Sequence, residues 1–310
     1  MKPVVSVIIT CDFASGTTES WNNLRASLAA LARQDCAEPT EFLLVESAAL
    51  ASEIPADLQD ILPALRIVAA PAVSAEGLKN HGVRMAAADL IAFIDGDCAA
   101  DPGWLSAFVE LMREHPEVAG VSGRTMYAPR SFLHRAMALV TRSYLDLNRL
   151  APTRHLTVNN AGFRRAVVLA HPFAEDLGAH MSLIDAAPIL QAGSKLYFDP
   201  RLRVEHAYQG WSTEKEIRRS MGYGVIRTRR LDRRLPYARM ARLGYLSIPL
   251  FVAARTLHSW VNCAKRARPY GVSWYELPAA FGLAAAACVL EVPGMIRAVR
   301  GVPLEKTSYR

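Results

Sequence analysis

Apolar and polar positions alternate along residues 1–115 in a way that predicts an α/β fold. Short apolar runs rich in β-branched residues predict buried strands at 4–10, 41–46, 65–69 and 90–94. Between them, Leu24, Leu28 and Leu31 recur at helical spacing, so a helix is expected over 18–34, a second over 76–88 and a third opening near Pro102. Strands that alternate with helices indicate a mainly parallel sheet covered on both faces.

The pattern changes after residue 115. Short strand candidates lie at 118–122, 156–160, 195–198 and 202–206, separated by longer helical or irregular pieces. This predicts a second half that continues the first rather than an independent domain. We therefore place one domain at 1–236, divided near residue 115.

Two long apolar segments follow, at 246–261 and 277–296, within an extension that we place at 237–310. A spanning helix needs roughly 20 predominantly apolar residues, and the second segment only reaches that length while containing Glu291 and two prolines. Basic residues flank both segments, which favours helices lying in an anionic membrane interface. A spanning hairpin and an ordinary helical subdomain are the alternatives.

Charge adds a second indication of an anionic partner. The chain has 310 residues and a net charge of +7, and nine arginines with one acid, Asp232, lie between Arg218 and Arg242. Such a run suggests phosphate, nucleic acid or an anionic membrane surface as partner, or else a solvated helix face. The five cysteines form no CxxC pair, which indicates reduced thiols in a cytosolic compartment.

Two carboxylates end the fourth predicted strand, in the sequence FIDGDC. Asp95 and Asp97 lie where ligands bind in such sheets, beyond the carboxyl ends of the strands, and Gly96 permits a tight turn between them. Two convergent carboxylates suit a hard cation such as Mg²⁺ or Mn²⁺, which neutralises the charge of a diphosphate leaving group. The alternative is a pair of turn aspartates that cap the next helix.

A series of motifs around this pair resembles the family 2 glycosyltransferases of the GT-A fold. In chain order they are VSVIIT, EFLLVES, GLKNHGVRMAAADLIAFIDGDCAADPGWL, NNAGFRR, FAEDLG and QAGSKLYFDPRLRVEH, within residues 4–230. The resemblance implies a GT-A-type α/β fold, with a donor half over 1–115 and an acceptor half over 116–236. It also implies inverting transfer of a sugar from a nucleotide donor to an acceptor hydroxyl.

The same resemblance assigns residues to the donor and the metal. The positions that it matches to the donor nucleotide are Thr10, Glu46, Lys79, Asn80, Asp95, Asn160 and Arg164. It matches Asp95, Asp97 and His206 to the metal, and Asp97 is the aspartate expected to ligate the metal directly. The segment 159–165 resembles a small-residue turn leading into a short helix.

The catalytic base departs from the family pattern. The family keeps a Glu-Asp pair after the FxExLG turn, whereas this chain has Met181 and Ser182 there. A substitute base must come from nearby, and we expect Asp176 or Asp185 to serve, with Glu175 ranked lower. Pro188 falls inside the helix expected to follow.

The function predicted from the sequence is thus metal-dependent inverting glycosyl transfer at the cytoplasmic membrane, in the synthesis of a cell-envelope glycan. A UDP-sugar is the favoured donor, a glycan or lipid-linked molecule the acceptor, and an anionic membrane surface a further partner; no nucleic-acid partner is expected. The alternatives are a binding module that holds a nucleotide sugar or a membrane partner without turnover, and a nucleotidyltransferase. The protein is expected to be cytoplasmic and peripheral or monotopic on that membrane.

Overall fold

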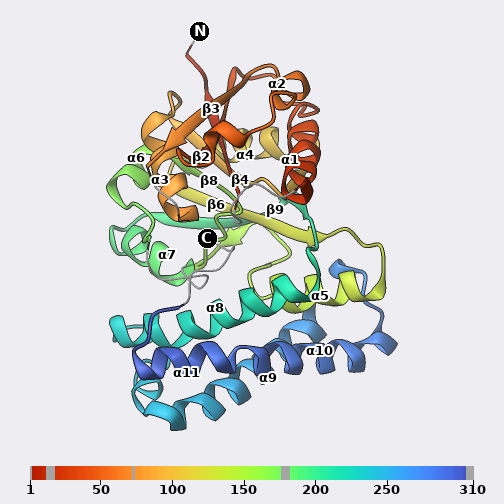
Figure 1. Ribbon diagram of the computed structural model, residues 1–310, viewed down its shortest axis with the longest axis vertical. Coiled ribbons are helices and arrows are strands. Elements are labelled where there is room, and N and C mark those ends of the chain that lie inside the picture. Colours follow the sequence, from red (N-terminus) through yellow and green to blue (C-terminus); the bar gives the residue numbers. More distant parts are fainter. Residues whose placement is uncertain (1, 12–17, 72–73, 176–181, 305–310) are drawn as a thin grey trace.

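The computed structural model describes residues 2–11, 18–71, 74–175 and 182–304 of the chain. Within these residues nine strands form one sheet, in the order β3-β2-β1-β4-β8-β6-β9-β5, with β7 paired to β9 (Figure 1). The strands are β1 (Val5–Thr10), β2 (Thr40–Ser47), β3 (Leu65–Ala70), β4 (Leu90–Asp95), β5 (Cys98–Ala100), β6 (Val118–Tyr127), β7 (Ala151–Pro152), β8 (Asn160–Arg164) and β9 (Lys195–His206).

The first half of the chain forms the parallel part of the sheet. Strand β1 lies between β2 and β4 and pairs with both in parallel. Its side chains alternate between two cores: Val7 and Ile9 pack with α1 (Thr18–Leu31) and α4 (Trp104–Glu114), and Ile8 packs with α3 (Ala75–Met85) on the other face. This alternation is why the strand is apolar throughout, and it confirms the predicted α/β fold.

The second half adds an antiparallel strand to the sheet, and our prediction of its position was wrong. Residues 160–164 form β8, between β4 and β6, where we expected a turn, and the short helix α6 (Arg165–Ala170) follows it. The small residues in this segment serve packing, because a Cβ on Gly162 would lie 2.1 Å from the Phe108 ring. The two strands expected at 195–198 and 202–206 are one strand, β9.

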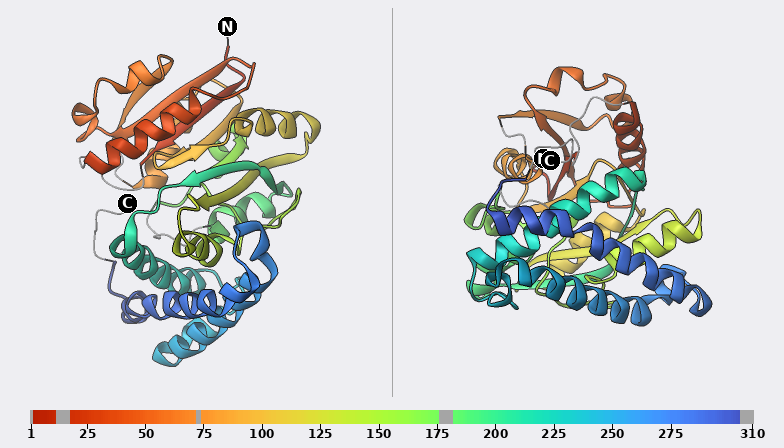
Figure 2. Two further views of the ribbon diagram at one scale, coloured as in Figure 1. Left: turned by 90° about the vertical axis from the view of Figure 1, so that its right-hand side faces the viewer. Right: turned by 60° about the horizontal axis from the view of Figure 1, so that its bottom comes forward.

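The helices within residues 210–300, together with the helix at 132–142, form a layer at the end of the molecule far from β3 (Figure 1 and Figure 2). The remaining α-helices are α2 (Leu58–Ile61), α5 (Phe132–Arg142), α7 (Ser182–Gln191), α8 (Gly210–Leu231), α9 (Ser247–Arg266), α10 (Leu277–Leu290) and α11 (Val292–Arg300). The short 3₁₀ helices are η1 (Ala51–Glu53), η2 (Met240–Arg242), η3 (Gly244–Leu246), η4 (Arg268–Tyr270) and η5 (Trp274–Glu276). Helix α7 continues through Pro188.

The extension packs tightly onto the rest of the chain. A Cβ on Gly294 of α11 would lie 1.8 Å from the carbonyl oxygen of Arg219 on α8, so only glycine permits this approach. Glu291, which is fully buried, separates α10 from α11 and accepts two hydrogen bonds from Arg255 at 2.6 and 2.7 Å. The segment 277–296 is therefore two helices joined at a buried ion pair.

One helical stretch in the described part of the chain, Trp274–Arg300, is long and apolar enough to cross a membrane. Its most apolar window has a mean hydropathy of 1.8, and 39% of that window is buried inside the protein. A core helix passes the same test of length and composition.

The arginine-rich run is only in part a surface patch. Arg218 is buried against Glu214 at 2.6 Å, Arg229 donates to the carbonyl oxygens of Val225 and Pro236, and Arg230 donates to three carbonyl oxygens on neighbouring elements. These arginines hold α8 against α11 and the η2 segment. Exposed cations remain at Arg227, Arg233, Arg239 and Arg242.

Candidate active site

The carboxyl ends of β1 and β4 bring two predicted site residues together. Thr10 and Asp95 are register partners and both are buried. Asp95 forms an ion pair with Lys79 of α3 at 2.9 Å, and the two side chains are only 1% and 2% exposed. A buried ion pair of this kind fixes both side chains, because separating them would leave an uncompensated charge.

Glu46 lies at the end of the neighbouring strand β2, one strand further from Asp95. It is buried, and its Oε1 accepts a hydrogen bond from the backbone N–H of Ser47 at 2.5 Å. The expected grouping of Thr10, Glu46, Lys79 and Asp95 along one edge of the sheet is thus present.

Asp97 turns to a different set of partners from Asp95. Its Oδ2 accepts a hydrogen bond from Gln209 Nε2 at 2.8 Å and lies 3.5 Å from His206 Nε2. The two aspartates therefore do not share partners: Asp95 is held by a lysine, and Asp97 faces a histidine.

His206 is oriented by its other ring nitrogen. Nδ1 lies 2.8 Å from the carbonyl oxygen of Ala207, a distance that requires Nδ1 to carry the proton. In the neutral ring the lone pair of Nε2 then faces the Asp97 carboxylate. Two lone-pair donors in this position favour a cation between them, and a backbone carbonyl on the second nitrogen is typical of metal-ligating histidines.

A third ligand atom completes this cluster. The ligand atoms of Asp97, Cys98 and His206 all lie within 4.8 Å of one another, and Cys98 Sγ is 3.8 Å from Asp97 Oδ1. The oxygen and nitrogen ligands can hold Mn²⁺, and the sulfur favours a softer ion such as Zn²⁺; Mg²⁺, which prefers oxygen ligands, fits this set least well. The residues present therefore fit a divalent cation.

The base candidate Asp185 lies in the first turn of α7 and is buried. One of its carboxylate oxygens accepts a hydrogen bond from the backbone N–H of Ala174 at 3.1 Å. Burial raises the pKa of Asp185 to about 7, with a smaller contribution from the charge of Glu76. Glu175 accepts a hydrogen bond from Asn80, and Asp176 lies outside the described residues.

Comparison with known proteins identifies the family. The model of glycosyl transferase family 2 matches residues 6–170, more than half of the chain. The chain belongs to glycosyl transferase family 2. A comparison with curated proteins found no match.

A solved structure shares the fold of this glycosyltransferase. The mannosyltransferase PcManGT from Pyrobaculum calidifontis, in complex with GDP-Man and Mn²⁺, is 17% identical with a TM-score of 0.61, covering 96% of this chain and 88% of its own. TarS 1–349 from S. aureus, in complex with UDP-GlcNAc, is 12% identical with a TM-score of 0.48, over 96% and 92% of the two chains.

Three residues matched to the donor have structural partners in this glycosyltransferase. Asn80 bonds to both the N–H and the carbonyl of Phe173, and so holds the segment that leads to Glu175. Asn160 accepts from Trp104 Nε1 and donates to the carbonyl oxygens of Arg124 and Leu202.

Arg164 has a structural role of the same kind. It donates to the carbonyl oxygens of Met112, Val118 and His115, at and just after the end of α4. The donor-binding roles of Asn80, Asn160 and Arg164 stay predictions. Asn160 lies opposite Ile94, next to Asp95, whereas Arg164 lies opposite Leu90 at the other end of β4.

Sequence reasoning missed Cys98 and Gln209. Cys98 directly follows Asp97, and Gln209 lies three residues after His206, so proximity in sequence to the two expected ligands was the available signal. Their involvement depends on β5 pairing with β9, which places Cys98 opposite His206.

Proposed function

We propose that this enzyme transfers a sugar, with inversion, from a nucleotide-sugar donor to an acceptor hydroxyl, using a divalent cation held by Asp97 and His206. The observation that carries the proposal is the Asp97–His206 contact with the imidazole orientation fixed by Ala207. Family membership supports the reaction class, and the mannosyltransferase with the same fold was solved with GDP-Man and Mn²⁺.

Each residue of the site has a chemical task in this proposal. The cation would neutralise charge on the leaving diphosphate. Lys79 and Asp95, as a rigid buried pair beside Thr10, would fix the strand ends that line the donor site. A base with a pKa of about 7 suits proton removal from an alcohol near neutral pH. Asp185 would therefore take the proton from the hydroxyl group of the acceptor, and Asp176 is the other candidate.

Calorimetry with UDP and GDP, each with and without Mn²⁺, tests the metal-dependent donor site. Mn²⁺ should strengthen nucleotide binding to the wild type, and this gain should disappear in Asp97→Asn and His206→Gln. Asp101→Asn, on the following turn and paired with Arg203 at 3.7 Å, is the matched control and should keep the gain. Equal nucleotide affinity with and without Mn²⁺ in the wild type would remove the metal from the proposal. Whichever of UDP and GDP binds more tightly identifies the nucleobase of the donor.

We further propose that the enzyme lies on an anionic membrane through the outer face of α9 and η5. Leu246, Leu250 and Leu257, at spacings that place them on one helix face, are 72%, 47% and 62% exposed, and Trp274 is 82% exposed. Exposed cations accompany them at Arg239, Arg242, Lys265 and Arg268, and each contributes about 1 kcal/mol near such a surface.

Sedimentation with vesicles tests this docking. Wild-type protein should bind vesicles that contain phosphatidylserine and be released by salt, and Leu246→Ser combined with Trp274→Ser should bind far less. Leu169→Ser, which changes an exposed leucine of α6, should bind like the wild type. Equal binding of all three proteins would contradict the proposal.

A binding module without turnover is the second candidate, because Ser182 occupies the position of the family base. Donor hydrolysis by the wild type is the deciding measurement. If the wild type is inert while Ser182→Asp hydrolyses the donor, the natural protein has lost its base.

A further inference from the structure

Cys98 belongs to the cluster around Asp97 and His206, although the family resemblance does not match it to the metal. Strand pairing places its thiol beside the histidine. Cys98 and His206 are register partners on the antiparallel strands β5 and β9, so their side chains lie on the same face of the sheet. The backbone N–H of Ala207 also donates to the carbonyl oxygen of Asp97 at 2.8 Å. Backbone hydrogen bonds therefore hold the three ligand-bearing residues together before a metal binds.

The spacing of the three ligand atoms fits a tetrahedral ion. Zn²⁺ binds nitrogen and oxygen at about 2.0–2.2 Å and sulfur at about 2.3 Å, which puts the atoms of a tetrahedral set about 3.3–3.6 Å apart. Here His206 Nε2 lies 3.5 Å from Asp97 Oδ2, and Cys98 Sγ lies 3.8 Å from Asp97 Oδ1. All the ligand atoms lie within 4.8 Å of one another. A small inward movement of the side chains would complete a tetrahedral set.

The sulfur of Cys98 also has a hydrogen-bond donor directed at it. Asn159 is buried, and its Nδ2 lies 3.9 Å from Cys98 Sγ and 3.3 Å from Thr125 Oγ1. The carbonyl oxygen of Asn159 accepts a hydrogen bond from the backbone N–H of Asp95, which fixes this residue beside the strand end. Groups that hydrogen-bond to metal ligands orient them and tune the bound ion. Asn159 is in the place where such a group would act on the sulfur.

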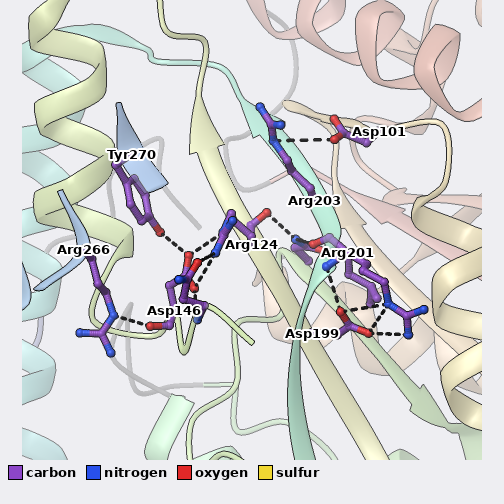
Figure 3. A network of polar contacts seen from close by, with 11 residues as sticks. Asp101, Arg124, Asp146, Asp199, Arg201, Arg203, Arg266 and Tyr270 are labelled. Carbon is purple, nitrogen blue, oxygen red and sulfur yellow. Dashed lines mark hydrogen bonds and ion pairs between the residues drawn. The ribbon is translucent and has the colours of Figure 1, made fainter. Parts of the chain in front are cut away.

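Strand β6 anchors Asn159 from behind. Thr125 follows Arg124 on this strand, and Arg124 donates two hydrogen bonds to Asp146 at 2.6 and 3.1 Å (Figure 3). Asp146 also accepts a hydrogen bond from Tyr270 of η4, at 3.2 Å. This part of β6 is therefore held from two sides, which fixes the Asn159 amide relative to the sulfur.

The other charges near the sulfur largely offset each other. Arg142, at the end of α5, interacts electrostatically with Cys98, and Glu214 of α8 interacts with Arg142 in turn. The negative charge that attracts a cation to the cluster therefore comes from Asp97 and, once a metal is bound, from the thiolate.

We propose that Cys98 is the third protein ligand of the cation site and that Asn159 positions its sulfur. The site then binds a thiophilic divalent ion, such as Zn²⁺ or Co²⁺, in the absence of nucleotide and in preference to Mg²⁺. Binding forms a metal–sulfur bond and displaces the thiol proton, which passes to the buffer. The role of the ion in sugar transfer rests on the proposed function, whereas its coordination by sulfur does not.

Titration of the wild type with Co²⁺, without nucleotide, tests the sulfur ligand. Co²⁺ should give the visible absorption of a tetrahedral ion together with a sulfur-to-metal charge-transfer band. Zn²⁺ should displace the Co²⁺ and remove both features, and a large excess of Mg²⁺ should not. X-ray absorption of the Zn²⁺-loaded wild type should show one sulfur at about 2.3 Å from the metal.

Two variants and a matched control assign the residues. Cys98→Ser should lose the charge-transfer band and bind Co²⁺ at least about 10-fold more weakly. Cys263→Ser, which removes another fully buried thiol, should match the wild type in both respects. Asn159→Ala should keep the visible bands, bind Co²⁺ about 10-fold more weakly and shift the charge-transfer band to longer wavelength, because the sulfur loses its donor. A purely structural role of Asn159 would leave the position of that band unchanged.

Two results with the wild type alone would overturn the proposal, so neither depends on the folding of a variant. They are an X-ray absorption spectrum without sulfur among the zinc ligands, and displacement of Co²⁺ by Mg²⁺ as readily as by Zn²⁺. An unchanged spectrum in Cys98→Ser would also overturn it, and an unmoved band in Asn159→Ala would refute the positioning role. Failure of the proposed function would appear differently, as nucleotide binding that does not respond to the ion although the charge-transfer band is present.

Discussion

Replacing Asp185 by asparagine should make the protein more stable and less active. The amide keeps an oxygen that can accept from the Ala174 N–H, and it removes a carboxylate that burial keeps from ionising. Because the folded protein holds the Asp185 proton up to about pH 7, whereas the unfolded chain releases it near 3.8, the contribution of Asp185 to stability is most favourable below pH 3.8 and falls as the pH rises to 7. Above that range the loss is constant.

The size of the effect follows from the two pKa values. Each pH unit between them contributes about 1.36 kcal/mol, so the carboxylate costs about 4 kcal/mol at pH 8 and close to nothing at pH 4. Asp185→Asn should therefore equal the wild type at pH 4 and exceed it by up to about 4 kcal/mol at pH 8.

Urea unfolding from pH 4 to 8.5 measures this difference, with the exposed substitution Asp60→Asn as the control that should show no such trend. If Asp185 is the base, the same variant should lose at least about 10²-fold in transfer with nucleotide binding unchanged. A stability difference between Asp185→Asn and the wild type that does not change with pH would refute the reasoning. If Asp185→Asn is more stable but equally active, Asp185 is not the catalytic base and Asp176 remains the candidate.

Two further predictions concern the extension and the metal cluster. Glu291→Gln should lower the free energy of unfolding by about 3–5 kcal/mol, because it leaves the buried Arg218 and the half-buried Arg255 without this carboxylate. Glu38→Gln, in an exposed pair, should cost less than about 1 kcal/mol. Urea unfolding of both variants checks this, and similar losses would contradict it. Cys98→Ser should abolish the sulfur-to-metal charge-transfer absorption expected when Co²⁺ binds the wild type, and identical spectra would exclude Cys98 as a ligand.

The parallel part of the sheet could be predicted because its strands are buried on both faces and are therefore apolar at every position. Strand β8 could not, because Ala161 and Gly162 resemble a turn in sequence, and the reason for the glycine is the Phe108 ring on α4, which leaves no room for a side chain at 162. The glycine is required by a contact between residues 54 positions apart in the sequence, and no local sequence pattern reveals such a contact.

The same limit applies to charged residues. The sequence placed Asp95 and Asp97 at a strand end, as found, but their separate partners come from α3 and from the end of β9. The arginines of α8 looked like one basic surface in part because some of their acceptors, Glu291 for Arg218 and the carbonyl oxygen of Ala298 for Arg230, lie more than sixty residues away.

Helix α8 links the Asp97–His206 cluster to the layer of helices formed by α9, α10 and α11. It begins at Gly210, directly after the Gln209 whose amide holds Asp97, and crosses α11 with almost no space between backbones at Gly294. Glu291, just before α11, is within 3.5 Å of Arg218 on α8. Since a buried ion pair and a close helix crossing both resist displacement, the orientation of Asp97 relative to the outer helices is set by packing. A membrane bound at α9 would therefore hold the cation site at a fixed height above the lipid, which is the arrangement that an enzyme acting on a membrane-bound acceptor requires.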